Sequence, residues 1–224
     1  MLPTIMKSSA IRMVAILALV AIPAFASPIY VNNFSFEDTV TGFSTCLGTN
    51  CLSGNLTIPS WTSSVPGQSG IFNVTGPNGY YWTGPPSDGV QSAYVYTRSS
   101  TAPVTLSQTV GATTVAGWVY TLTVDIGERL DTAASFAGTA DLLINGVQHF
   151  VACPAPVRGS FVTCTTSYVA TASNQAMSIE LSANALQGNF DNVRLDAVPE
   201  PASFLLIGSA LFVLSSLRRR RANS

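Results

Sequence analysis

The chain of 224 residues contains few charges, because only 9% of its residues are Asp, Glu, Lys or Arg, whereas soluble domains carry about 25%. No lysine follows Lys7, and the stretch from Ser27 to Val198 holds four arginines against ten acidic residues, a net charge of −6. A body of this charge cannot form the basic stripe that binds phosphate backbones. The composition therefore excludes nucleic acid as an expected partner.

The sequence also lacks the common signatures of hydrolytic enzymes. It contains no G-x-S-x-G motif, and any Ser-His-Asp system would depend on the single histidine, His149. Asp125, Glu128 and Asp131 surround Arg129 and could form a carboxylate pair for glycoside hydrolysis, but a solvated loop explains the same pattern. We assign no catalytic residue, and the sequence favours a binding or structural protein over an enzyme.

Residues 1–26 are typical of a secretory signal peptide. Lys7 and Arg12 form a basic region, Met13 to Ile22 is apolar, and Ala24-Phe25-Ala26 is a small-residue cleavage site before Ser27. A retained membrane anchor is the alternative, although the apolar run is short for a membrane span. We expect the Sec translocon and signal peptidase as partners.

The segment 198–224 combines a proline motif, an apolar run at 202–217 and a basic tail at 218–221. The motif is Pro199-Glu200-Pro201 and the tail is Arg218, Arg219, Arg220 and Arg221. This order resembles the PEP-CTERM sorting signal, which implies an exosortase as partner and a surface or extracellular-matrix destination in a Gram-negative-type bacterium. A helix over 202–217 is predicted to insert in the membrane before processing, with the arginines on the cytoplasmic side; a plain tail anchor is the alternative.

Four cysteines form two local pairs, and an even count in an exported chain favours disulfides. Their spacing favours Cys46–Cys51 and Cys153–Cys164 among the three possible connectivities. A zinc site is the alternative, but the chain has one histidine and no C-x-x-C.

Residues 27–197 are predicted to form one all-β domain, a β-sandwich of the jelly-roll type. Apolar and polar residues alternate over Trp118–Ile126 and Met177–Leu181, and Asn145-Gly146 is a strong hairpin signal. The stretches 41–70 and 76–89 are rich in Gly, Pro, Ser and Thr and are predicted to be long loops. Further strands are expected at Tyr30–Phe36, Ile71–Val74, Gln91–Thr97, Val104–Val110, Phe161–Ala170 and Phe190–Leu195.

Several motifs across residues 30–196 occur in a familiar order. They are Asn33-Phe34-Ser35-Phe36-Glu37, then Trp61, Leu106-Ser107-Gln108-Thr109-Val110, Tyr120 to Gly127, and Phe190-Asp191-Asn192-Val193-Arg194-Leu195. This order resembles the galactose-binding-like jelly rolls of carbohydrate-binding modules, and it is similar to exported relatives of the calcium-dependent hapalindole-type alkaloid cyclases. The cyclases use an acidic residue and aromatics near a cleft, but no such position can be matched to this chain.

The resemblance implies a structural calcium ion held by Glu37 and Asp191. Asp191 shares its parity with Val193 and Leu195, so its carboxyl group is expected on an apolar face, where it needs a partner. Oxygens at Asn33 and Asp88 are weaker candidate ligands. A turn cap, or pairing of Asp191 with Arg194 or Arg129, is the alternative.

The aromatic residues suggest a second kind of site, because aromatic faces can stack on sugar rings. The candidates are Tyr80, Tyr81, Trp82, Tyr94 and Tyr96. Ordinary packing explains the same residues equally well, and Trp61 is expected in the core. Three functions therefore remain: a non-catalytic module that binds or contributes to extracellular polysaccharide, which we favour, a calcium-dependent cyclase-like or lyase-like enzyme, and a purely structural surface protein.

Overall fold

The computed structural model describes residues 26–38, 40–97, 102–131, 138–183 and 187–200, and within them it contains strands and turns but no helix. No helix in this part of the chain is long and apolar enough to span a membrane. The strands are β1 (Ser27–Ile29), β2 (Ser44–Thr45), β3 (Cys51–Gly54), β4 (Thr62–Ser63), β5 (Ser69–Val74), β6 (Gln91–Tyr96), β7 (Val104–Thr113), β8 (Trp118–Glu128), β9 (Gly138–Ile144), β10 (Val147–His149), β11 (Ser160–Val169), β12 (Ala176–Ala183) and β13 (Gln187–Pro199).

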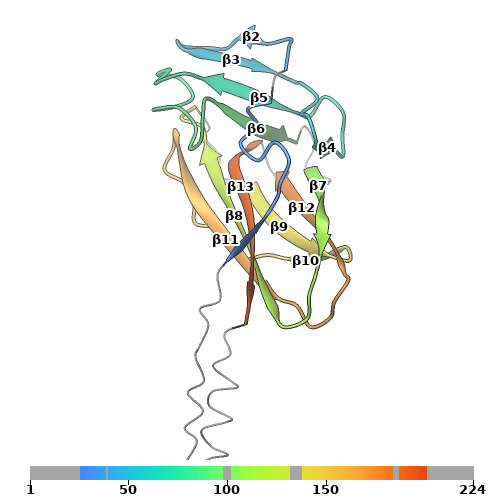
Figure 1. Ribbon diagram of the computed structural model, residues 1–224. Coiled ribbons are helices and arrows are strands. Elements are labelled where there is room, and N and C mark those ends of the chain that lie inside the picture. Colours follow the sequence, from blue (N-terminus) through green and yellow to red (C-terminus); the bar gives the residue numbers. More distant parts are fainter. Residues whose placement is uncertain (1–25, 39, 98–101, 132–137, 184–186, 201–224) are drawn as a thin grey trace, which may run out of the picture. The chain divides into compact units, whose positions relative to one another are not determined.

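The strands form two antiparallel sheets that make a β-sandwich (Figure 1). The larger sheet has the order β11-β8-β13-β6-β5-β3-β2, with β1 paired to β13, and the smaller has the order β10-β9-β12-β7-β4. The first residue of β1, Ser27, pairs with Ala197. The start and the end of the described domain therefore lie side by side.

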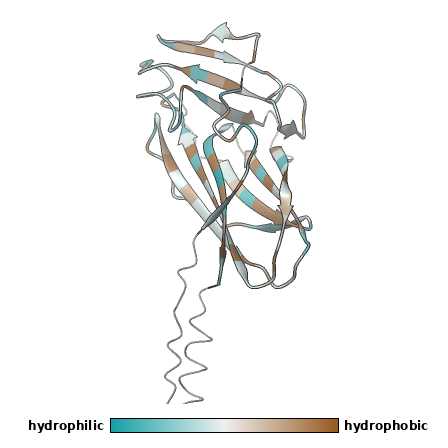
Figure 2. Ribbon diagram, viewed as in Figure 1, coloured by the Kyte–Doolittle hydropathy of each residue, from teal (hydrophilic) through white to brown (hydrophobic). Residues whose placement is uncertain are grey.

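Side chains that point alternately to the two faces of each strand create the core. In β8, Tyr120, Leu122, Val124 and Ile126 are buried and share one face, and they pack with Leu106, Leu142, Ile179 and Leu181 from the smaller sheet. The alternating brown and teal bands of Figure 2 follow this pattern along the strands. We call the opposite face of the larger sheet, turned away from the smaller sheet, the outer face.

Most strands agree with the sequence prediction, and the hairpin at Asn145-Gly146 is confirmed. Asn145 has φ of 48° and Gly146 has φ of 79°, the pair of left-handed conformations that a tight type I′ hairpin requires. The loop predicted over 41–70 is only partly irregular, because it contains β2, β3 and β4. These strands are two to four residues long, too short to leave an alternating pattern.

The strand predicted over Tyr30–Phe36 is wrong. The strand ends at Ile29, and Asn33 and Phe36 both have positive φ, of 47° and 60°. The amide of Phe36 donates to the carbonyl oxygen of Asn33 at 3.2 Å, which closes a turn. The turn places Phe36 in the core, where its ring lies 5.4 Å from that of Trp61, and it projects Glu37 toward the start of β6.

Candidate functional site

Two carboxylates bind the short segment that leads into β6. The Oε1 atom of Glu37 accepts hydrogen bonds from the backbone amides of Val90, at 2.7 Å, and Gln91, at 2.5 Å. The Oδ2 atom of Asp191 accepts one from the backbone amide of Asp88, at 2.7 Å. Glu37 and Asp191, which lie far apart in the sequence, are therefore connected through the same few residues.

Asp191 is fully buried, but the prediction that it shares the face of Val193 and Leu195 is wrong. A β-bulge shifts the pairing of β13 with β8 after Asp191, and Asn192 in the bulge has φ of 52°. One extra residue reverses the alternation of side chains. Val193 consequently points into the core, while Asp191 lies opposite Asp125 on the outer face.

Burial dominates the protonation of Asp191. Removal from water raises its pKa from 3.8 to about 8, and the negative charges of Asp88 and Asp125 act in the same direction. Hydrogen bonds from the backbone amides of Asp88 and Asn192 lower the pKa but are outweighed. Asp191 is therefore mostly protonated at neutral pH when no cation lies beside it.

Asn192 connects Asp191 to Asp125. Its backbone amide donates to Oδ1 of Asp191 at 2.7 Å, and its side-chain amide donates to Oδ2 of Asp125 at 2.9 Å. The other oxygen of Asp125 accepts from the hydroxyl of Thr163 at 2.6 Å. The guanidinium group of Arg129, which the sequence offered as an alternative partner of Asp191, instead binds Asp131 at 2.5 Å.

The oxygen atoms beside the Asp88 segment suit a hard cation such as calcium, which takes six to eight oxygen ligands. Glu37 and Asp191 supply carboxylates, and the buried side-chain oxygen of Gln91 has no hydrogen-bond partner among the described residues. The same residues contain no group of three or more His, Cys, Asp or Glu that could hold a metal. Amide and main-chain oxygens would therefore have to complete a calcium shell around the two carboxylates.

Asn33 and Asp88, the two weaker candidate calcium ligands, form hydrogen bonds within the protein. The side-chain oxygen of Asn33 accepts from the amide of Asp38 at 3.0 Å, and its carbonyl oxygen accepts from the indole nitrogen of Trp61 at 3.3 Å. Asn33 thus stabilises the turn that carries Glu37. Asp88 contributes its backbone amide to Asp191.

The predicted aromatic residues gather on the outer face over β5 and β6. Trp82 and Tyr94 are buried and, with Phe72 and Phe161, form what we call the aromatic cluster. The Phe72 ring lies 5.0 Å from Tyr94 and 6.0 Å from Trp82, and Trp82 stacks on Phe161 at 4.9 Å.

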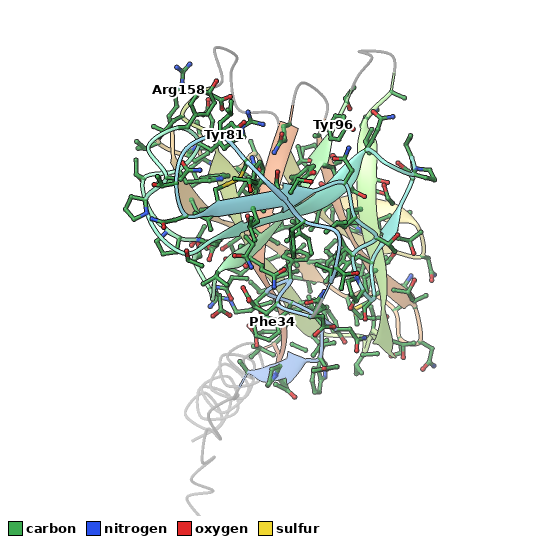
Figure 3. The ribbon with its side chains drawn as sticks, turned by 90° about the horizontal axis from the view of Figure 1, so that it is seen from above. Phe34, Tyr81, Tyr96 and Arg158 are labelled. Atoms are coloured by element: carbon green, nitrogen blue, oxygen red, sulfur yellow. A yellow bond between two sulfur atoms is a disulfide. The ribbon has the colours of Figure 1, made fainter. Side chains whose placement is uncertain are left out.

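Three tyrosines border the aromatic cluster and reach solvent, and we call them the aromatic platform. Tyr80 is 42% exposed, and Tyr81 and Tyr96 are half-buried. The rings of Tyr80 and Tyr81 meet edge to face at 4.7 Å. Figure 3 shows Tyr81 and Tyr96 on the side of the domain opposite Phe34. Trp82 and Tyr94 lie beneath the platform, so of the five predicted residues these three have access to a ligand.

Arg129 is a component of this surface, whereas its acidic sequence neighbours had favoured a solvated loop. Its guanidinium carbon lies 4.2 Å from the centre of the Tyr81 ring, and it donates to the side chain of Gln187 at 2.8 Å. Burial raises the pKa of Tyr81 and the charge of Arg129 opposes that rise. Phe72 and Phe161 were also missed as members of the cluster. Gly127 was a possible signal, because a Cβ there would lie 2.7 Å from the Phe161 ring.

Both predicted disulfides are confirmed, Cys46–Cys51 and Cys153–Cys164. Cys164 belongs to the main core, whereas Cys46 and Cys51 pack on the aromatic cluster. The ring of His149 lies 4.2 Å from that of Tyr168, which agrees with a structural role.

The predicted sorting residues lie at and beyond the end of β13. Pro199 is the last residue of the strand, opposite Trp118, and the amide of Glu200 donates to the carbonyl oxygen of Gly117 at 2.8 Å. Pro201, the apolar run 202–217 and the arginines 218–221 lie outside the described residues, as does nearly all of the predicted signal peptide.

The fold and the disulfides define a jelly-roll β-sandwich of an exported protein. Over residues 27–196 the chain matches the family described as HpiC1 cyclase, and it belongs to that HpiC1-like family. Residues 197–221 match the PEP-CTERM protein-sorting motif. This motif implies export to the cell surface or the extracellular space, with an exosortase as partner. No curated protein has significant sequence similarity to the chain.

Among solved structures, the chain is similar to a cyclase from Fischerella sp. TAU in complex with 4-(1H-indol-3-yl)butan-2-one. The two share 26% identity with a TM-score of 0.60, over 77% of this chain and 98% of the cyclase. TmCBM61 in complex with beta-1,4-galactotriose gives 13% identity and a TM-score of 0.47, over 75% of this chain and 98% of the module. A family 11 carbohydrate-binding module from Clostridium thermocellum, in complex with a beta-1,3-1,4-mixed-linked tetrasaccharide, shares 14% identity with a TM-score of 0.40. The match covers 67% of this chain and 96% of the module.

Proposed function

We propose that this exported domain is a non-catalytic module that binds extracellular polysaccharide through the aromatic platform. The observation that carries the proposal is the edge-to-face pair of Tyr80, which is exposed, and Tyr81, which is half-buried. Sugar rings stack on aromatic faces while phenolic hydroxyls bond to their hydroxyl groups. The buried aromatic cluster beneath keeps these rings at fixed positions.

The charges around the platform favour a neutral sugar. Arg129 lies over the Tyr81 ring, and Asp131 neutralises it by accepting two hydrogen bonds, at 2.9 and 2.5 Å. The body as a whole carries a net charge of −6, which repels polyanions. A neutral polysaccharide therefore fits better than one rich in uronic acids.

The binding proposal can be tested with the exported protein and a panel of soluble polysaccharides. Affinity electrophoresis against xylan, mixed-linkage β-glucan, galactan and alginate should show retardation by a neutral polymer and none by alginate. Tyr80→Ala and Tyr81→Ala should each abolish retardation, and Tyr30→Ala, at another exposed tyrosine, should leave it unchanged. A wild-type protein that binds no polymer of the panel would refute the proposal.

A second candidate function, an acid-catalysed cyclase-type reaction, rests on Asp191. The chain belongs to a family described by a cyclase, and the raised pKa of about 8 keeps this buried carboxyl group protonated at neutral pH. A carboxyl group that stays protonated at neutral pH can donate a proton to a reacting group. A calcium ion on Asp191 requires the ionised form, so its two proposed roles exclude each other at any one time. Conversion of an indole-terpene substrate by the wild type, lost in Asp191→Asn, would support the enzyme.

We further propose how the chain reaches its destination. The Sec translocon exports it, signal peptidase cuts before Ser27, and the segment 202–217 anchors it transiently in the inner membrane with Arg218–Arg221 on the cytoplasmic side. An exosortase then cuts near Pro199–Pro201. Intact-mass analysis of surface-released protein tests the two cuts, and a mass that retains the four arginines would contradict the second.

A further inference from the structure

The loop closed by the Cys46–Cys51 disulfide lies against the segment that carries the platform residues Tyr80 and Tyr81. The backbone amide of Thr49 donates to the carbonyl oxygen of Asn78 at 3.2 Å. The side-chain amide of Asn50 donates to the carbonyl oxygen of Pro77 at 3.4 Å. Two of the four residues between the two cysteines therefore bond to this segment.

Gly48, directly before Thr49, makes the closest approach. Its φ is +88°, and a Cβ built on it would lie 2.2 Å from the carbonyl oxygen of Asn78 and 3.3 Å from Cβ of Tyr80. A side chain cannot occupy this space. The backbones of the disulfide loop and the aromatic segment are therefore in direct contact.

Asn78 transmits this contact to the aromatic residues. Its side-chain oxygen accepts hydrogen bonds from the backbone amides of Tyr80, Tyr81 and Trp82, at 3.1, 2.8 and 2.9 Å. The backbone amide of Asn78 donates to the carbonyl oxygen of Trp82 at 3.2 Å. The conformation that presents Tyr80 and Tyr81 thus depends on Asn78, and Asn78 is held by Thr49.

The two disulfides differ in what they can stabilise. Cys46 and Cys51 lie 5 positions apart in the sequence and Cys153 and Cys164 lie 11 positions apart, so the first disulfide closes the smaller loop and restricts the unfolded chain less. The first also packs on the aromatic cluster with Phe72 and Trp82. Its main effect should therefore be on local geometry.

We infer that the Cys46–Cys51 loop is a positioning element of the polysaccharide site, whose disulfide holds Tyr80 and Tyr81 in their binding arrangement. This inference rests on the proposed function for its consequence in binding. Reduction of the bond weakens the binding of sugar while the sandwich remains folded. Loss of the Cys153–Cys164 disulfide, in the main core, instead lowers the stability of the fold and leaves the aromatic platform unchanged.

The test compares three forms of the exported protein: the wild type, the double variant Cys46→Ser/Cys51→Ser, and the matched control Cys153→Ser/Cys164→Ser. Two readouts are taken well below the melting temperature, namely hydrogen exchange of the amides of Tyr80–Trp82 and affinity for the polymer that the wild type binds best in the panel above. We expect the first double variant to exchange these amides about tenfold faster and to bind about tenfold more weakly, on the scale of local opening and affinity changes. The control should show neither change.

Unchanged exchange and affinity in Cys46→Ser/Cys51→Ser would overturn the inference, as would equal effects in the control. If the wild type binds no polymer, the proposed function fails, while hydrogen exchange still decides whether the disulfide holds the aromatic segment. If the double variant does not fold, Gly48→Ala replaces it, paired with Gly117→Ala. Gly117 has a similar φ of +77° with nothing within 4 Å of a built Cβ, so only Gly48→Ala should accelerate exchange.

Discussion

Asp191 on β13 lies directly opposite Asp125 on β8, and one residue, Asn192, donates a hydrogen bond to each of them. Two buried carboxyl groups in this position repel each other when both are ionised. The fold keeps them there by a bulge, by the amide of Asp88 and by the hydroxyl of Thr163. Protonation of Asp191, or a cation bound beside it, relieves the repulsion.

The pH dependence of stability should reveal the protonation of Asp191. An acid whose pKa rises on folding, here from 3.8 to about 8, binds more protons in the folded state between these values, so stability falls as the pH rises from about 4 to about 8. The slope from one such group is at most about 1.4 kcal/mol per pH unit. Urea unfolding with chelator at pH 5 to 8 should show this decline for the wild type, less of it for Asp191→Asn, and the full decline for Asp196→Asn.

Calcium should remove the same decline. A ligand that binds only the folded state stabilises it, by about 2.7 kcal/mol at one hundred times its dissociation constant. Millimolar calcium should therefore raise the melting temperature by several degrees, and chelator should reverse it. Glu37→Gln and Asp191→Asn should each lose most of this response, and Asp141→Asn, on the other sheet, should keep it. A wild type that responds to neither calcium nor chelator would exclude the site.

Gly89 is expected to be essential for the bond between Glu37 and the segment before β6. Its φ is +69°, and a Cβ there would lie 2.3 Å from Oε1 of Glu37. Gly79 has φ of +70° and nothing within 4 Å, so Gly79→Ala shows the backbone cost alone. Each alanine should lower the free energy of unfolding by about 1 kcal/mol through backbone strain. Urea unfolding should show a larger loss for Gly89→Ala, and calcium should stabilise this variant less than the wild type. Equal losses would show that the contact with Glu37 contributes nothing.

Asp141 on β9 is predicted to weaken the fold at neutral pH. It is 6% exposed and lies opposite Glu180, and burial, followed by the charge of Glu180, raises its pKa to about 6. Stability from this group falls as the pH rises from about 4 to about 6. Asp141→Asn should raise the melting temperature by a few degrees at pH 7, with no gain at pH 4. A melting temperature at pH 7 that is unchanged or lower in Asp141→Asn would contradict this prediction.

The sequence predicted those parts of the fold that depend on local alternation. Tyr120 to Ile126 alternate over a long strand, and Asn145-Gly146 adopts the turn that its residue types favour. Asp191 shows where this reasoning fails, because a single added residue in a bulge reverses every later side chain. The residue types at and around Asn192 do not predict the bulge, because it depends on contacts with Asp125 and the Asp88 segment.

The sequence predicted aromatic residues of this candidate site, but not which of them are exposed and which are buried. Tyr80, Tyr81 and Trp82 are adjacent in the sequence, yet the first is 42% exposed and the third 1%. The difference arises from Asn78, whose side chain binds three consecutive amides, and from Phe161 on a distant strand, on which Trp82 stacks. Tertiary partners of this kind leave no periodic pattern.

The central position of β13 has a consequence for the order of events during export. This strand pairs with β8, β6 and β1, yet it is the last strand of the domain, and the predicted membrane segment begins three residues after its end. A chain that crosses the membrane from its N-terminus exposes β8 and β6 as unpaired edges until β13 emerges, and such edges invite aggregation. On the export route proposed above, the larger sheet therefore closes only when the sorting segment has reached the membrane. A chain truncated before β13 would leave the translocon with β8 and β6 lacking their shared partner strand.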